Sequence, residues 1–278
     1  MSSSITPVPV LPSADHSLMG IALHGLSATA CLRCIADSIS KQQGGWVVTA
    51  NLDHLRRMVN EPKYRDLCRS ASLVVADGVP LIWASAVQGH PLPERIAGSD
   101  LIWTLSETAA KEDRSIFLLG GAPGTAVEAA KVLSARYPGL RIAGQYCPTV
   151  GFENDETQIE EMRKCLKEAR PDIVFVALGS PKQEEWIVRL CSMLPATWWI
   201  GVGISFSFVC GRVKRAPLWM QRCGLEWLHR LAQEPTRLFR RYILQDIPFV
   251  IVLMAAAVRQ RFASRQTLEA QKVWEGDI

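Results

Sequence analysis

Short β-rich runs alternate with amphipathic stretches from residue 18 to about residue 210. The six strand candidates are Trp46–Asn51, Leu73–Asp77, Ile116–Gly120, Arg141–Tyr146, Ile173–Gly179 and Trp198–Gly203. The helical patterns between them include Ala28–Lys41, Asp100–Lys111, Gly124–Tyr137, Glu156–Ala169 and Pro181–Leu194. Strands that alternate with helices are typical of a parallel sheet covered on both faces. The pattern therefore predicts a doubly wound, Rossmann-like α/β fold with a mostly parallel sheet.

The pattern changes near Gly211, where strand-like runs stop and basic, helical, Trp-containing sequence begins. Residues 211–265 hold eleven Lys and Arg against three Asp and Glu, a net charge of +8, although the whole chain carries only +4. Such local positive charge favours phosphate groups, whether of nucleic acid, anionic lipid or a pyrophosphate-bearing substrate. We therefore divide the chain into a flexible tail (1–17), an α/β domain (18–210), a basic helical appendage (211–265) and a C-terminal tail (266–278).

Two further features bear on location. The longest apolar run, Ile247–Val258, has twelve residues and would extend about 18 Å as a helix, against the roughly 30 Å of a bilayer core. The run is therefore too short to cross a membrane, and it could belong to the core, to an interface or to a lipid contact. The basic helical segment that contains it is expected to lie on a membrane without crossing it. No signal peptide is evident, and the eight Cys include one close pair, Cys31 and Cys34, without the spacing of a metal site. A cytoplasmic protein without a metal is expected.

Glycine-rich turns follow two of the predicted strands. Backbone N–H groups at such turns, and at the helix that follows, can bind phosphate, whereas Gly and Pro also suit a tight turn without any ligand. Neither turn is a GxGxxG fingerprint, and GxxxxGK[ST] is absent, which disfavours a dinucleotide site and a P-loop ATPase. The ligand-binding candidates here are Gly120, Gly121, Gly124, Gly179, Gln183 and Glu184.

Polar residues end two other strands. Asp77 closes an apolar strand and precedes Gly78, a place where partial burial would raise its pKa toward that of a useful general base. Thr49 and Asn51 lie two positions apart and project to the same side, where they could hydrogen-bond a sugar or a base. For all of these polar strand ends the alternative is a helix N-cap.

The basic segment carries a regular series of arginines. They recur at intervals of seven, eight, seven and four residues, so a helical segment would place them near one face. Arginine suits bidentate phosphate contacts, although a charged face is usually just solvated. The members of the series are Arg215, Arg222, Arg230, Arg237 and Arg241.

Taken in chain order, these motifs resemble the WecG/TagA/CpsF family of glycosyltransferases, from about residue 18 to about residue 245. The α/β domain contributes Thr49-x-Asn51, Ala76-Asp77-Gly78, Arg95-x-x-Gly98-x-Asp100, Gly120-Gly121-x-Pro123-Gly124, Pro171-Asp172, Gly179-x-Pro181-x-Gln183-Glu184 and Gly201-Val-Gly203. The basic segment contributes Arg215-Ala-Pro-x-Trp219, Gly224-Leu-Glu226-Trp227 and Glu234-Pro235-x-Arg237.

The resemblance implies an inverting hexosyltransferase that needs no metal or other cofactor. Such an enzyme moves a sugar from a UDP-sugar to a polyprenyl-diphosphate-linked sugar at the inner face of the membrane, in the synthesis of cell-surface polymers or exopolysaccharide. Residues 18–210 would bind the UDP-sugar, and residues 211–265 would dock on the membrane. UDP-glucose, UDP-N-acetylmannosamine and its uronate are the donors to consider. The absence of an Asp-x-Asp tripeptide agrees with a reaction that needs no metal.

The resemblance also assigns roles to residues. Asp77 matches the proposed catalytic base, and Thr49 and Asn51 match polar residues that line the same site. Arg95 and Asp100 would shape the acceptor side. The appendage would close over the pyrophosphate with Arg215, Arg222 and Arg237.

Other readings remain open at this point. A non-catalytic, membrane-associated nucleotide-binding module is the first alternative, and an NAD-dependent oxidoreductase is disfavoured by the missing fingerprint. No nucleic-acid partner is expected, and a homo-oligomer is possible.

Overall fold

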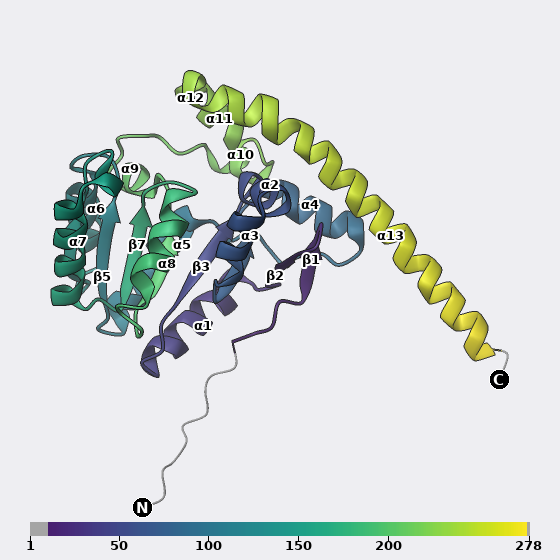
Figure 1. The fold of residues 1–278 in the computed structure, drawn as a ribbon, viewed down its shortest axis with the longest axis horizontal. Coiled ribbons are helices and arrows are strands. Elements are labelled where there is room, and N and C mark those ends of the chain that lie inside the picture. The colour runs from purple at the N-terminus through teal and green to yellow at the C-terminus, as the bar shows by residue number, and fades with distance from the viewer. Residues whose placement is uncertain (1–10, 277–278) are drawn as a thin grey trace, which may run out of the picture.

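The structure, a computed structural model, describes residues 11–276. Its centre is a six-stranded sheet with the order β4-β3-β8-β7-β5-β6, in which every neighbouring pair is parallel (Figure 1). The strands are β3 (Gly45–Ala50), β4 (Leu73–Ala76), β5 (Ser115–Gly120), β6 (Arg141–Tyr146), β7 (Ile173–Ala177) and β8 (Trp198–Gly201). All six predicted strands are confirmed, and so is the α/β fold class.

Helices cover both faces of the sheet because neighbouring strand residues are apolar on both sides. Val47 packs into one apolar cluster and Val48 into the other, and Phe117 and Leu118 divide in the same way. One face is covered by α1 (Ala28–Ser40), α5 (Gly98–Lys111) and α6 (Thr125–Arg136). The other face is covered by α2 (Leu52–Asn60), α3 (Pro62–Arg69), α4 (Val79–Gln88), α7 (Glu156–Ala169) and α8 (Lys182–Cys191).

Short elements complete the α/β domain. Strands β1 (His16–Leu18) and β2 (Ile21–Leu23) form a two-stranded antiparallel ribbon. The ribbon lies beside β4, where the His24 backbone N–H donates to the Val74 carbonyl at 2.8 Å. The remaining short turns of helix are η1 (Phe152–Asn154) and α9 (Ser205–Val209). Paired structure thus begins at residue 16, inside the expected tail 1–17, of which residues 1–10 lie outside the described residues.

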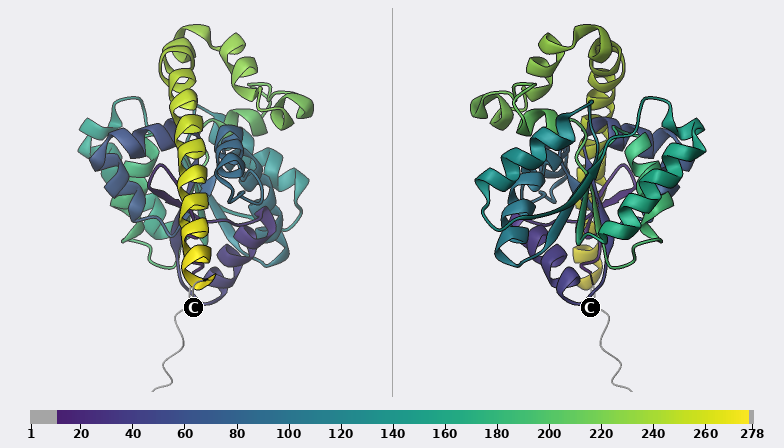
Figure 2. Two further views of the ribbon diagram at one scale, coloured as in Figure 1. Left: turned by 90° about the vertical axis from the view of Figure 1, so that its right-hand side faces the viewer. Right: turned by 90° about the vertical axis from the view of Figure 1, so that its left-hand side faces the viewer.

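The basic segment is helical, as expected, and arches over the carboxyl edge of the sheet before it descends along the domain (Figures 1 and 2). Its two separate helices are α10 (Leu218–Arg222) and α11 (Glu226–Gln233). A continuous helix follows, made of α12 (Pro235–Phe239), the π-helical η2 (Arg240–Asp246) and α13 (Ile247–Gly276). The boundary expected at residue 265 falls inside α13.

The long helix α13 is part of the hydrophobic core. Phe249, Leu253 and Ala257 are buried in the same apolar cluster as Leu81 and Ala84 of α4. Helix α13 packs along α4. The left view of Figure 2 shows α13 running down the length of the domain. The division at residue 211 therefore separates two sequence patterns but does not separate two hydrophobic cores.

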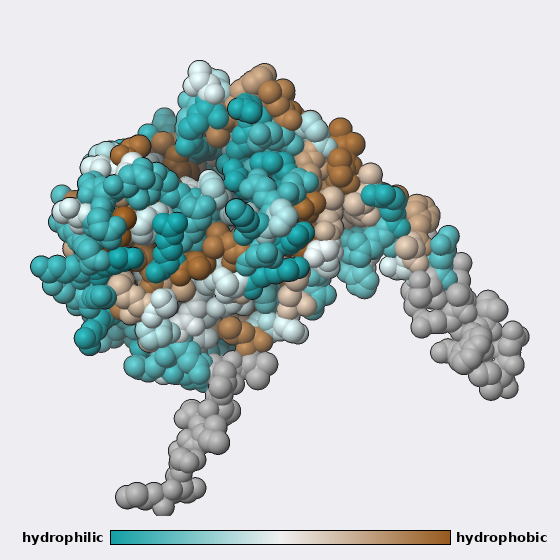
Figure 3. Space-filling view, viewed as in Figure 1, coloured by the Kyte–Doolittle hydropathy of each residue, from teal (hydrophilic) through white to brown (hydrophobic). Residues whose placement is uncertain are grey.

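The outer side of the same helix is apolar and exposed. The large exposed apolar side chains are Leu244 of η2 and Ile247, Ile251, Val252 and Phe262 of α13. Figure 3 shows hydrophobic surface on the upper part of this continuous helix. In the described part of the chain, Pro235–Ser264 is the one helical stretch that is long and apolar enough to cross a bilayer. Length and composition do not distinguish crossing from surface binding, so the expected surface location stays a prediction.

Candidate active site

A cavity of about 820 Å³ lies over the carboxyl ends of the central strands. Strand ends and the loops after them form its floor, and α11, η2 and the first turns of α13 form its opposite wall. The candidates from sequence that line it are Thr49, Asn51, Asp77, Arg95, Gly121, Gly179, Gln183, Arg230, Arg237 and Arg241. The fold thus brings together side chains that lie far apart in the chain, from Thr49 to Arg241.

Asp77 follows β4 and faces the cavity. Its backbone N–H donates to the Ala50 carbonyl at 2.8 Å, and Gly78, not Asp77, is the N-cap residue of α4. Asp77 Oδ1 lies 3.5 Å from Arg95 Nη1. Burial raises the pKa of Asp77 to about 6, with Arg95 opposing the rise and Glu226 adding to it. A carboxylate with this pKa is mostly ionised at neutral pH and is more basic than an exposed Asp, as a general base requires.

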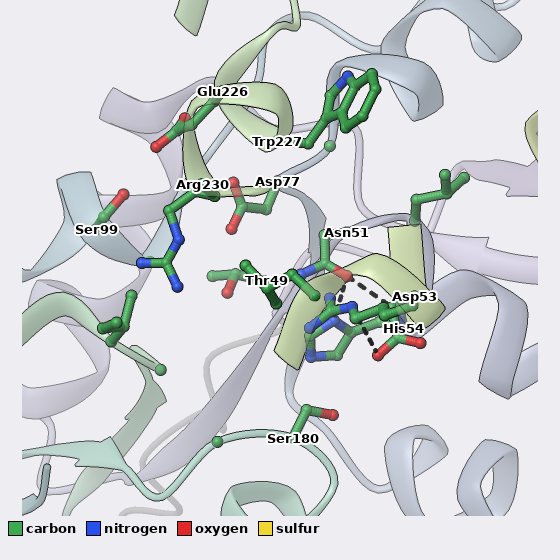
Figure 4. Close-up of a pocket in the computed structure, with 18 of the residues that line it drawn as sticks. Thr49, Asn51, Asp53, His54, Asp77, Ser99, Ser180, Glu226, Trp227 and Arg230 are labelled. Carbon is green, nitrogen blue, oxygen red and sulfur yellow. Dashed lines mark hydrogen bonds and ion pairs between the residues drawn. The ribbon is translucent and has the colours of Figure 1, made fainter. Parts of the chain in front are cut away.

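Thr49 and Asn51 lie beside Asp77 (Figure 4). The Thr49 hydroxyl donates to the Gly201 carbonyl at 3.5 Å. Asn51 is the N-cap of α2, because its Oδ1 accepts from the His54 backbone N–H at 3.2 Å. The N-cap alternative is therefore confirmed for Asn51, which lines the cavity as well.

The glycine turns divide between the cavity and the packed interior. Gly121 and Gly179 line the cavity. Gly120 does not; a Cβ there would lie 2.8 Å from Leu178 Cδ2, so close packing explains this glycine. Gly124 is the N-cap of α6 with a φ of 80°, and the Arg212 guanidinium beside it donates to the Pro123 carbonyl. Of the two polar residues on the first turn of α8, Gln183 lines the cavity and Glu184 is buried behind it.

The expected arginine face is not formed. Gly224 and Pro235 separate α10, α11 and α12, so the regular spacing does not translate into one helical face. Arg222 is exposed and lies outside the cavity wall. The spacing argument fails because it assumes one straight helix.

Arg215 and Asp100 also lie outside the cavity lining, and they pair with each other. The Arg215 guanidinium contacts both oxygens of Asp100, with Nη2–Oδ2 at 3.1 Å, and its Nε lies 3.3 Å from Glu226 Oε1. Burial acts to lower the pKa of Arg215, but the hydrogen bonds with Asp100 raise it. Arg95 Nη1 contacts Glu226 Oε2 at 3.4 Å from the other side. These ion pairs fasten α11 to the α/β domain.

Three other members of the arginine series reach the cavity wall: Arg230, Arg237 and Arg241. Arg230 is buried; its Nη2 donates to Glu234 Oε1 at 2.9 Å, and no partner for its Nη1 is found among the described residues. Arg241 Nε lies 3.6 Å from Asp53 Oδ2. Arg237 Nε lies 2.5 Å from Glu234 Oε2, so each of the three arginines has a carboxylate partner. The cavity therefore has Asp77 on one side and, on the other, a wall that holds three arginines together with Glu226 and Asp246.

Several lining residues were not predicted as site residues, among them Asp53, His54, Ser99, Tyr242 and Asp246. Glu226 and Trp227 also line the cavity; they stand in a motif that carries the family resemblance but were given no role. Asp53 and His54 lie two and three positions after the candidate Asn51, and their position just after a strand end could have marked them as candidates. A buried ion-pair cluster joins Asp53 to Arg56 and Arg241, and these arginines lie 3.8 and 3.7 Å from Asp246. Burial raises the pKa of Asp246 to about 6.

The fold and the cavity together define the class of protein. It is a doubly wound α/β enzyme whose cavity opposes a carboxylate of raised pKa to a wall of arginines. This combination suits group transfer that involves phosphate-bearing substrates.

Comparison with known proteins gives the family. The model of the glycosyl transferase WecG/TagA/CpsF family matches residues 16–264, and the chain belongs to this family. The chain is 33% identical over 199 residues to the N-acetylglucosaminyldiphosphoundecaprenol N-acetyl-beta-D-mannosaminyltransferase of Bacillus spizizenii, covering 72% of this chain and 75% of that protein. It is 34% identical over 216 residues to the Staphylococcus aureus protein of the same name, covering 77% and 81%.

Proposed function

We propose that this glycosyltransferase moves a sugar from a UDP-sugar to a polyprenyl-diphosphate-linked sugar, with inversion at the anomeric carbon. The observation that carries the proposal is Asp77, a carboxylate of raised pKa that faces a cavity walled by three arginines. The two relatives named above support the acceptor class, since their name includes a diphosphoundecaprenol-linked N-acetylglucosamine. By the same reasoning UDP-N-acetylmannosamine is the first donor to test.

The reaction requires one proton transfer and one displacement. Asp77 takes the proton from the acceptor hydroxyl, and the oxygen attacks the anomeric carbon from the face opposite UDP. The bond between that carbon and the phosphate oxygen breaks, and UDP leaves with the electron pair. Arg230, Arg237 and Arg241 supply positive charge for the diphosphates that both substrates carry.

The reaction is tested with a donor screen against a synthetic lipid-diphosphate-N-acetylglucosamine acceptor. We expect transfer from one UDP-sugar, with an inverted anomeric configuration in the product. Retention of configuration would contradict direct displacement assisted by a single base. Binding of UDP-sugars without any transfer would favour a non-catalytic module.

Transfer is expected to persist in excess EDTA. The arginine wall already provides the positive charge that a metal would give to the leaving diphosphate. Among the side chains that the structure describes, no group of three or more His, Cys, Asp or Glu is placed to hold a metal ion. The measurement is the initial rate with EDTA, with added magnesium, and with added manganese. Activity that disappears with EDTA and returns with either metal would contradict this expectation.

Replacing Glu226 with Gln is expected to shift the pH dependence of transfer to lower pH. The negative charge of Glu226 raises the pKa of Asp77, so its removal lowers that pKa and keeps Asp77 ionised to a lower pH. The acid limb of kcat/KM should therefore move down. Glu112→Gln, at an exposed position after α5, is the matched control. An acid limb that stays in place or moves upward would contradict the electrostatic link between α11 and Asp77.

The protein is expected to bind the inner face of the cell membrane through the basic appendage and the outer side of α13. Basic residues near anionic lipid are worth about 1 kcal/mol each, and exposed Leu244 adds apolar surface. The full chain should sediment with vesicles that contain anionic lipid, and Leu244→Glu should weaken sedimentation without changing Tm. Equal binding to neutral and anionic vesicles would contradict the electrostatic part.

A further inference from the structure

The side chain of Asn51 has one fixed orientation. Its Oδ1 accepts from the His54 backbone N–H at 3.2 Å and lies 2.8 Å from His54 Nδ1. Since a backbone N–H can only donate, the atom it meets is the amide oxygen and not the amide nitrogen. The oxygen faces His54, and the nitrogen lies on the side of Thr49 (Figure 4). Both hydrogen bonds of the Asn51 side chain to described residues involve the oxygen, and neither involves this nitrogen.

The buried carboxylate of Glu184 contacts His54 on the side of the ring opposite Asn51. His54 Nε2 lies 3.3 Å from Glu184 Oε1, and both side chains are more than nine-tenths buried. Gln183 Nε2 donates to the same oxygen at 2.6 Å, while Gln183 Oε1 accepts from the Gly203 N–H at 3.1 Å. Burial alone would raise the pKa of Glu184, but the hydrogen bond with His54 lowers it, so the carboxylate is ionised. Both ring nitrogens of His54 thus lie against oxygen atoms that can accept a hydrogen bond, Asn51 Oδ1 and Glu184 Oε1.

Thr49 has the opposite hydrogen-bonding character. Its hydroxyl proton is directed to the Gly201 carbonyl at 3.5 Å, which leaves the oxygen free to accept. The cavity therefore presents an acceptor at Thr49 beside a donor at Asn51. An ionised phosphate oxygen only accepts, whereas a sugar hydroxyl both donates and accepts. The pair of side chains is complementary to a hydroxyl.

We propose that Thr49 and Asn51 together bind one hydroxyl of a sugar substrate. His54 and Glu184 are positioning residues that keep the Asn51 amide nitrogen turned toward that hydroxyl. This inference rests on the proposed function, because it requires a sugar in the cavity. It assigns to Asn51 a donor role and to the buried His54–Glu184 pair a part in substrate recognition.

Asn51→Asp tests the donor. Aspartate keeps the oxygen that meets His54 and replaces the amide nitrogen with an oxygen that cannot donate when ionised. By titration calorimetry, we expect the affinity for UDP to stay within about twofold of the wild type, and the affinity for the UDP-sugar used in transfer to fall at least about tenfold. If the hydroxyl belongs to the lipid-linked acceptor, the KM of that acceptor should rise by this factor while the UDP-sugar affinity is unchanged.

The control for this substitution is Asn60→Asp, at the exposed end of the same helix, which should alter neither affinity. An equal loss of UDP and UDP-sugar binding in Asn51→Asp would show a phosphate contact and would overturn the proposal. Unchanged UDP-sugar binding together with an unchanged acceptor KM would also overturn it. If the wild-type chain binds no UDP-sugar and transfers none, the proposed function itself fails.

A pair of substitutions at His54 tests positioning, and it remains informative if Asn51→Asp does not fold. The amide nitrogen of Asn can take the place of Nδ1, and that of Gln the place of Nε2. His54→Asn therefore keeps a donor toward Asn51, whereas His54→Gln keeps only the contact with Glu184. We expect His54→Gln to reproduce the selective loss of sugar binding and His54→Asn to lose less.

The double variant separates positioning from a general loss of structure. If His54 acts through Asn51, adding His54→Gln to Asn51→Asp should weaken sugar binding by less than about twofold further. Multiplied losses in the double variant, or equal effects of the two His54 substitutions, would show that His54 does not act through Asn51. Glu184→Gln should give the same pattern as His54→Gln.

Discussion

Replacing Asp77 with Asn is expected to lower turnover by roughly 10²–10⁴-fold while the affinity for UDP changes by no more than about twofold. Asp77 is the carboxylate that the cavity places for removal of the acceptor proton, and asparagine has the same shape without the basicity. Its backbone hydrogen bond to Ala50 does not involve the side chain, so the strand end is kept. Steady-state turnover on the lipid-linked acceptor and calorimetry with UDP measure the two quantities.

The pH dependence gives an independent measure of the same residue. With the pKa of Asp77 raised to about 6 by burial, the base is ionised above this pH, so wild-type kcat/KM should fall as the pH decreases through about 6. Asp66→Asn, an exposed carboxylate on α3, serves as the control and should behave as the wild type. Near-normal turnover in Asp77→Asn would remove Asp77 from the mechanism.

Replacing Arg230 with Gln should have the second largest effect, a loss of about 10–100-fold in kcat/KM. A hydrogen bond to a charged group contributes about 1.5–3 kcal/mol, and Arg230 offers a buried, unpartnered Nη1 at the cavity wall. Arg222→Gln, at an exposed position away from the cavity, should lose much less. The comparison tests whether an arginine binds substrate because it lies at the cavity wall, as Arg230 does, or because it belongs to the regular arginine series, as Arg222 also does.

The same pair of variants has a clear contrary outcome. A greater loss with Arg222→Gln than with Arg230→Gln would mean that the basic segment binds substrate from its outer surface. Melting temperatures belong in the experiment, because Arg230 also donates to Glu234 and lies 5.4 Å over the Phe208 ring. A variant with normal Tm and lowered kcat/KM isolates the role in substrate binding.

The strands and the sheet edge were predictable because their signals are local. A buried parallel strand needs apolar residues on both sides, as Val47 and Val48 show, and such runs are legible without knowledge of their neighbours. Polar residues at the ends of β3 and β4 then converge because parallel strands end at one edge. Thr49, Asn51 and Asp77 were found by this reasoning alone, and the family resemblance added Arg95.

The arginine wall was only partly predictable. Its geometry depends on the breaks between α10, α11 and α12 and on ion pairs between residues far apart in the sequence. Arg215 was expected at the ligand and is paired with Asp100, 115 positions away in the chain. No periodicity reveals such a partner. Arg241 enters the wall from the π-helical η2, whose altered turn changes the direction in which its side chains project.

The shared core of α13 and α4 also limits how members of this family can be recombined. A chimera that exchanges only the residues after Gly211 would place a foreign α13 against the native α4, although Phe249 and Leu253 are shaped to fit it. It would also separate Arg241 and Asp246 from their partners on α2. The smallest exchangeable unit is therefore discontinuous: the C-terminal helices together with the surfaces of α2 and α4 that they cover.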